Sequence, residues 1–170
     1  MARKSSSGSV ALAATINDAL VAADATVATA ESLTGGRLAV LLTTAPGASR
    51  SYLGGVVSYA TDVKTRVLDV PAAVVDEHGV VSAACARAMA DGIRRLMGTT
   101  YGVSTTGVAG PEPQEEKPPG TVYVAVAGPA GVTALSLELS GDRETIQRRT
   151  CGEALSALAV VLREEETPLR

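Results

Sequence analysis

The sequence TVATAESLTGG at residues 26–36 decides the fold, because it joins a short strand to a helix. Residues 26–30 are short and rich in Val and Ala, which predicts a buried strand. Gly35 and Gly36 follow, and the apolar residues of 38–42 then predict a helix. A strand that passes into a helix through a tight turn is the repeating unit of α/β proteins.

The same alternation extends in both directions along the chain. Apolar residues recur at helical spacing over 9–23, and Ser82 is placed to cap a long helix that Gly98 ends. We expect helices at 9–23, 38–42, around Lys64, from Pro71, at 83–97 and at 142–165, and strands at 54–59, 101–105, 121–127 and 132–139. The last two strands flank the turn 128–131, which predicts a β-hairpin.

A hairpin requires at least one antiparallel pair, so we expect a mixed sheet rather than a purely parallel one. With helices before and after most strands, the pattern predicts a single α/β domain with three layers, α/β/α, over residues 9–165. Residues 1–8 are polar and are predicted to form a disordered N-terminal tail.

Composition excludes several classes of function. The 170 residues carry a net charge of -3 and 2% aromatic residues, with no basic stripe, so we expect no nucleic-acid partner. No apolar run approaches about 20 residues, so we expect no membrane partner. Cys85 and Cys151 lack the spacing of a zinc site and are interpreted as buried thiols in a reducing, cytoplasmic compartment.

The turn after the first strand is the first candidate site. Ser32 and Thr34 place hydroxyl groups at the end of the strand, and Gly35 and Gly36 allow a ligand to approach the backbone. The N–H groups of the next helix favour negative charge, which suits a phosphate or the oxyanion of acyl transfer. An ordinary capped glycine turn would have the same residues.

Tyr59 ends the second strand and Lys64 lies about one helical turn beyond it, and the two form the next candidate. A lysine can act as the general base for a serine when burial lowers its pKa. A fall from about 10.4 to about 7 costs roughly 4.6 kcal/mol. A solvated surface lysine is the simpler interpretation of Lys64 alone.

Two further motifs contain candidate ligand contacts. Thr106, Gly107 and Gly110 lie in a glycine-rich loop after a strand, which can hold a phosphate or ribose through backbone N–H groups, or can be a plain loop. Asp142 is expected to cap the last helix, with Arg143 facing a cleft. His78 is the only histidine and lies in a predicted turn, which gives a Ser-His-Asp triad little support.

Taken together, these motifs resemble the CinA C-terminal domain family. The family pattern is Ala-Glu-Ser-Cys-Thr-Gly-Gly, Tyr-Ser-Asn-x-x-Lys, a Gly-Ile-Ala-Gly-Pro loop, Lys-Pro-x-Gly-Thr-Val and Ser-Gly-Asp-Arg. The chain has related motifs, in the same order, at 30–36, 59–64, 106–111, 117–122 and 140–143. The resemblance covers about residues 9–163. Departures are Leu33 for Cys, Ala60 and Thr61 for Ser-Asn, and Pro113 and Gln114 in a stretch that is more glycine-rich in the family.

The resemblance implies an amidohydrolase that uses neither a metal nor a cofactor. Its implied roles are Ser32 as nucleophile, Lys64 as base and Tyr59 in proton transfer, with Thr106 and Arg148 in the substrate site. The implied substrate is a small nucleotide, nicotinamide mononucleotide, which is deamidated to nicotinate mononucleotide and ammonia, and the implied assembly is a homo-oligomer. The alternatives are a non-catalytic nucleotide-binding module and a partner protein in competence or the damage response.

Overall fold

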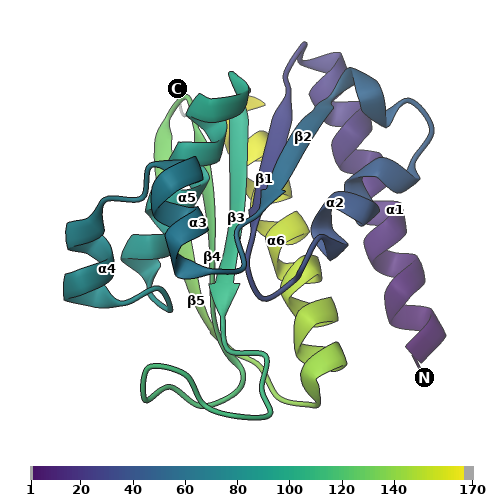
Figure 1. Cartoon of the computed structure of the whole chain (residues 1–170). Helices are drawn as coiled ribbons and strands as arrows, with labels where there is room; N and C mark the ends of the chain where they lie inside the picture. The colour runs from purple at the N-terminus through teal and green to yellow at the C-terminus, as the bar shows by residue number, and fades with distance from the viewer. Residues whose placement is uncertain (1, 167–170) are drawn as a thin grey trace.

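The computed structural model describes the backbone of residues 2–166 and the side chains of residues 7–165 (Figure 1). Its helices are α1 (Ala2–Ala22), α2 (Arg37–Thr44), α3 (Thr61–Leu68), α4 (Ala72–His78), α5 (Ala83–Met97) and α6 (Arg143–Glu166), with a 3-10 turn, η1, at Ala48–Arg50. Its strands are β1 (Val27–Glu31), β2 (Tyr52–Val57), β3 (Tyr101–Gly107), β4 (Thr121–Gly128) and β5 (Gly131–Glu138).

The five strands form one mixed sheet in the order β2-β1-β3-β4-β5. β1 is parallel to both β2 and β3, whereas β3, β4 and β5 pair in an antiparallel manner. β4 and β5 are joined by the short turn between Gly128 and Gly131, which confirms the predicted hairpin. β3 runs two residues beyond its predicted end, because Thr106 and Gly107 continue the pairing with β4.

Helices cover both faces of the sheet, as the sequence predicts (Figure 1). α1, α2 and α6 contact one another and form one outer layer, and α6 also packs on β3 and β4. α5 lies on the opposite face against β1, β3 and β4, with α3 and α4 packed on it. The fold is therefore the predicted three-layer α/β/α domain.

Each face of the sheet has its own apolar core, built mainly from aliphatic side chains. Ile16 and Leu20 of α1 pack with Leu155 and Leu158 of α6 on one face. On the other face, Met89 and Ile93 of α5 pack with Leu68 of α3 and the small alanines of β1. Small side chains let the helices approach the sheet closely, so the positions of the strand ends are well determined.

The carboxyl ends of the three parallel strands meet at one edge of the sheet. Ser32 N donates to Thr105 O at 3.0 Å, and Ser58 N donates to Glu31 O at 2.8 Å. These two bonds carry the pairing one residue beyond β1 and β2. They bring the chain at Ser32, Ser58 and Thr106 together, although 74 positions separate the first from the last.

The N-terminal tail and self-association are two expectations that the fold leaves untested. α1 begins at Ala2, within the segment predicted to be a tail, and the disorder of residues 1–8 stays a prediction. Leu53 and Val57 are exposed on the edge strand β2, but self-association also stays a prediction. Within residues 2–166, none of the helices combines the length and apolar character needed to cross a membrane.

Two helix glycines give a matched test of the packing that places α3. A Cβ on Gly92 of α5 would collide with the backbone oxygen of Leu68, whereas one on Gly152 of α6 would lie 3.7 Å from Ser9 Oγ. Gly92→Ala should lower the free energy of unfolding by about 1–3 kcal/mol. Gly152→Ala should raise it by up to about 1 kcal/mol, because alanine favours the helix. Urea denaturation of both variants checks this, and equal effects would contradict the packing.

Candidate active site

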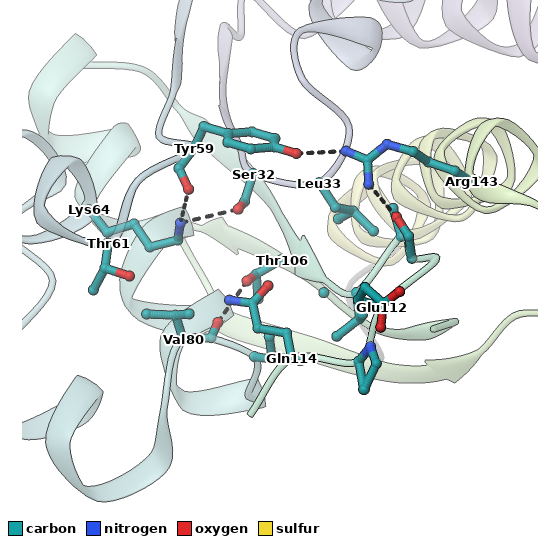
Figure 2. A pocket seen from close by; sticks show the side chains of 16 residues that line it. Ser32, Leu33, Tyr59, Thr61, Lys64, Val80, Thr106, Glu112, Gln114 and Arg143 are labelled. Atoms are coloured by element: carbon teal, nitrogen blue, oxygen red, sulfur yellow. Dashed lines mark hydrogen bonds between the residues drawn. The ribbon is translucent and has the colours of Figure 1, made fainter. Parts of the chain in front are cut away.

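A cavity of about 280 Å³ opens at the carboxyl ends of β1, β2 and β3 (Figure 2). Its walls come from the turn after β1, the start of α3, the segment before α5, the loop after β3 and the first residue of α6. The residues that line it are Ser32, Leu33, Tyr59, Thr61, Lys64, Val80, Val81, Thr106–Gly110, Glu112–Gln114 and Arg143. Hydroxyl, amine, guanidinium and amide groups therefore converge on one space.

Ser32 and Lys64 lie within hydrogen-bond distance of each other in this cavity. Lys64 Nζ is 3.1 Å from Ser32 Oγ (Figure 2) and 2.6 Å from the carbonyl oxygen of Ser58. It lies 3.5 Å from the carbonyl oxygen of Tyr59. The first turn of α3 brings the lysine back over the end of β2, so residues 32 positions apart in the sequence become neighbours.

Lys64 is 1% exposed, which is unusual for a lysine. Burial lowers the pKa of its amine, because the charged form loses its hydration, and the smaller electrostatic effects of Cys85 and Glu115 oppose this change only in part. Among the side chains of residues 7–165, no carboxylate forms an ion pair with the amine. Burial therefore makes this amine easier to deprotonate than that of a free lysine.

The turn that carries Ser32 is held by the carboxylate of Glu31, which is itself buried. Its Oε2 accepts hydrogen bonds from Thr34 Oγ1 at 2.7 Å, Gly36 N at 3.0 Å and Leu38 N at 3.1 Å. Its Oε1 accepts from Ala39 N at 2.8 Å. The carboxylate thus satisfies the free N–H groups at the start of α2 and complements the helix dipole.

This bonding changes the interpretation of three predicted substrate contacts. The Thr34 hydroxyl is 2.7 Å from Thr105 Oγ1 as well as bonded to Glu31, and it is fully buried. Gly36 N donates to Glu31, and Gly35 N donates to Ser32 O at 3.1 Å. The structure does not bring Thr34, Gly35 or Gly36 to the Ser32 cavity, because Glu31 takes the place that the sequence assigned to a ligand anion.

Thr106 and Gly107, which the sequence places in a loop, are the last residues of β3, and Gly110 lies in the loop that follows. Thr106, Gly107 and Gly110 all line the cavity. The Thr106 hydroxyl donates to Val80 O at 2.7 Å, so it ties β3 to the segment that precedes α5. Thr106 lies across the cavity from Tyr59 in Figure 2.

Tyr59 and Arg143 form the opposite rim of the cavity. The Tyr59 phenol is 58% exposed and accepts a hydrogen bond of 2.6 Å from Arg143 Nη2, while Arg143 Nη1 donates to Gly110 O at 2.5 Å. Figure 2 shows the phenol directed toward Arg143 rather than toward Lys64. The Tyr59 backbone carbonyl, not its phenol, lies beside the lysine amine.

The structure places Arg143 rather than Arg148 in the cavity. Arg148 lies farther along α6 and lines a different hollow. Asp142 caps α6 through a hydrogen bond of 2.8 Å from Thr145 N, which fixes the direction in which Arg143 leaves the helix start. The Ser-Gly-Asp-Arg motif is the sequence signal for Arg143.

The loop 112–117 closes one side of the cavity and is anchored by Glu115. The Glu115 carboxylate accepts from Val80 N and Val81 N, both at 2.9 Å. This contact holds Pro113 and Gln114 against the cavity, and the Gln114 side chain points into it in Figure 2. Glu31 and Glu115 thus each use a carboxylate to anchor backbone N–H groups beside the cavity. Among the side chains described, no group of three or more His, Cys, Asp or Glu is arranged to hold a metal ion.

A family model described as the CinA C-terminal domain matches residues 9–162. The chain belongs to the CinA C-terminal domain family. A CinA-like protein of Frankia casuarinae is 49% identical over 143 residues, which are 84% of this chain and 33% of that protein. A CinA-like protein of an Anaeromyxobacter species is 50% identical over 138 residues, 81% of this chain and 34% of that protein.

Solved structures of CinA proteins have the same fold. A competence-damaged protein (CinA) superfamily protein from Klebsiella pneumoniae superposes with a TM-score of 0.89 at 32% identity, covering 92% of this chain and 98% of the other. The competence/damage inducible protein CihA from Agrobacterium tumefaciens gives a TM-score of 0.86 at 32% identity, with 91% and 95% covered. The chain spans about one third of the length of the curated CinA-like relatives above.

Replacing Glu31 tests whether its carboxylate holds the Ser32 turn. Glu31→Gln keeps the shape but directs an amide N–H₂ at backbone N–H donors, so the free energy of unfolding should fall by about 2–3 kcal/mol. Glu138→Gln on the exposed end of β5 is the control and should change it by less than about 0.5 kcal/mol. Thermal or urea denaturation measures both, and a neutral Glu31→Gln would contradict the assignment.

Proposed function

We propose that this chain hydrolyses a primary carboxamide, that of nicotinamide mononucleotide, by nucleophilic catalysis with Ser32 and Lys64. The observation that carries the proposal is the buried Lys64 amine, 3.1 Å from Ser32 Oγ at the wall of an open cavity. A nucleophile and a base within hydrogen-bond distance are the requirement for an activated serine. The substrate itself is taken from the family resemblance.

In the first half-reaction, Ser32 Oγ attacks the carbonyl carbon of the amide while its proton passes to Lys64 Nζ. The resulting tetrahedral species collapses as the C–N bond breaks. The lysine ammonium returns the proton to the departing nitrogen, which leaves as ammonia. An ester between Ser32 and the nicotinate group remains, and Lys64 is neutral again.

In the second half-reaction, a water molecule attacks the ester carbonyl and gives its proton to Lys64. The bond to Ser32 Oγ breaks, the serine recovers its proton, and nicotinate mononucleotide leaves. Each step uses the same amine as acceptor and then donor, which requires a pKa below that of a free lysine. The carbonyl oxygens of Ser58 and Tyr59 hold the amine in place throughout.

The nucleotide phosphate would lie toward Arg143 at the rim of the cavity. Arg143 donates hydrogen bonds to Gly110 O and to the Tyr59 phenol. Because neither partner is a carboxylate, the positive charge of Arg143 stays available to an anion. A guanidinium binds phosphate oxygens through paired hydrogen bonds. In this arrangement Tyr59 orients Arg143, while Thr106 and Gly107 border the part of the cavity nearest Ser32.

Removing the nucleophile separates catalysis from binding. Ser32→Ala should lower the release of ammonia from nicotinamide mononucleotide by at least about 10³-fold with little change in nucleotide affinity, because the hydroxyl acts in the transition state. Ammonia assay and calorimetry measure the two quantities. Ser136→Ala, on the exposed face of β5, is the control and should keep full activity.

Two results would contradict this part of the proposal. If Ser32→Ala kept most of the activity, Ser32 would not be the nucleophile. If the unmodified protein bound the nucleotide but released no ammonia, the non-catalytic binding module would be the better account.

The lowered pKa of Lys64 sets the direction of the pH dependence. The protonated amine cannot accept the Ser32 proton, so kcat/KM should rise as pH rises through the pKa of Lys64 and then level off. Because burial lowers that pKa, the plateau should begin below about 10.4, the value of a free lysine. Initial rates from pH 5 upward, with buffers matched in ionic strength, test this, and a rate that falls with pH over the same range would contradict it.

A further inference from the structure

A second cavity of about 470 Å³ lies between α1, α2 and α6, on the other side of the turn that carries Ser32. Ser9, Gly35, Gly36, Arg37, Val40, Leu41, Glu144, Arg148 and Cys151 line it. None of these residues lines the Ser32 cavity. Three residues that the sequence connects with substrate, Gly35, Gly36 and Arg148, therefore meet here instead.

Two arginines from different helices line this space, Arg37 at the start of α2 and Arg148 in the second turn of α6. Among the side chains of residues 7–165, neither forms an ion pair with a carboxylate. The Arg148 Nε atom is inaccessible to solvent and has no hydrogen-bond partner there. A buried donor without a partner costs free energy unless a ligand or water completes it.

The rest of the lining is mostly apolar. Val40 is 65% exposed, although it is a large aliphatic residue, and Leu41 lies beside it. The Cys151 thiol is buried, and burial raises its pKa to about 12, so it stays neutral and forms part of the apolar lining. Glu144 is the one acidic side chain among the lining residues, against two arginines.

We propose that this cavity binds a small phosphate ester, with the phosphate on Arg37 and Arg148 and the apolar or aromatic part against Val40 and Leu41. Two guanidinium groups from separate helices suit a phosphate because each can donate two parallel hydrogen bonds. The N-terminus of α2 adds nothing to the site, since the Glu31 carboxylate occupies its N–H groups. The site is separate from the Ser32 cavity and does not depend on the reaction proposed there.

Calorimetric titration with adenosine 5′-monophosphate tests the proposal, with adenosine and inorganic phosphate as matched probes. The nucleotide should bind more tightly than either fragment. Arg37→Gln and Arg148→Gln should each weaken its binding by about tenfold, because each removes charge-assisted hydrogen bonds. Arg148→Lys keeps the charge and the aliphatic stem, so it should have a smaller effect.

Two control variants identify where the nucleotide binds. Arg66→Gln, on the surface of α3 where Arg66 pairs with Asp62, should not change the affinity. The titrations are repeated in Arg143→Gln, which removes the cation of the Ser32 cavity and should leave binding at the second cavity intact. Melting curves establish that each variant is folded before its affinity is compared.

Several outcomes would overturn the proposal. They are an absence of binding up to millimolar nucleotide, an unchanged affinity in both Arg37→Gln and Arg148→Gln, and a loss of all binding in Arg143→Gln. If adenosine bound as tightly as adenosine 5′-monophosphate, the phosphate would have no role in binding. If inorganic phosphate bound as tightly as the nucleotide, Val40 and Leu41 would have no role in binding.

Discussion

Burial of the Lys64 amine is the constraint on which the rest of the site depends. A charged amine at this depth loses its hydration without gaining a carboxylate partner, so burial lowers the pKa of Lys64. The carbonyl oxygens of Ser58 and Tyr59 fix the position of the amine, and Ser32 Oγ completes its surroundings. The close contact of α3 with α5 at Gly92 keeps the helix where this arrangement is possible.

Glu31 has the corresponding role for the nucleophile. Its carboxylate joins the end of β1 to the first turn of α2, so the backbone between them has little freedom. Ser32 and Leu33 face one cavity from this turn, while Gly35 and Gly36 face the other. One buried carboxylate thus both positions the serine and separates two spaces of different chemistry, and it accepts hydrogen bonds from the N–H groups that the sequence assigned to a ligand anion.

The sequence predicted the elements, because hydrophobic periodicity is a local property, and the family resemblance linked Ser32 with Lys64 as nucleophile and base. It did not predict the carboxylate contacts. A glutamate at the end of a strand, such as Glu31, or in a charged loop, such as Glu115, has the same appearance as a solvated one until the tertiary structure supplies its donors. Arg143 rather than Arg148 lines the Ser32 cavity because α6 begins directly after Asp142. Five residues of helix rotate the side-chain direction by well over one turn, so Arg148 points elsewhere.

The most direct test of the account is the pKa of the Lys64 amine itself. Selective ¹⁵N labelling of lysine, with Lys64→Met to assign the signal, allows the Nζ resonance to be followed by NMR as a function of pH. Lys64 should titrate clearly below about 10.4, the value of a free lysine. A Lys64 amine that stays protonated to that pH or above would contradict the assignment of a neutral base beside Ser32.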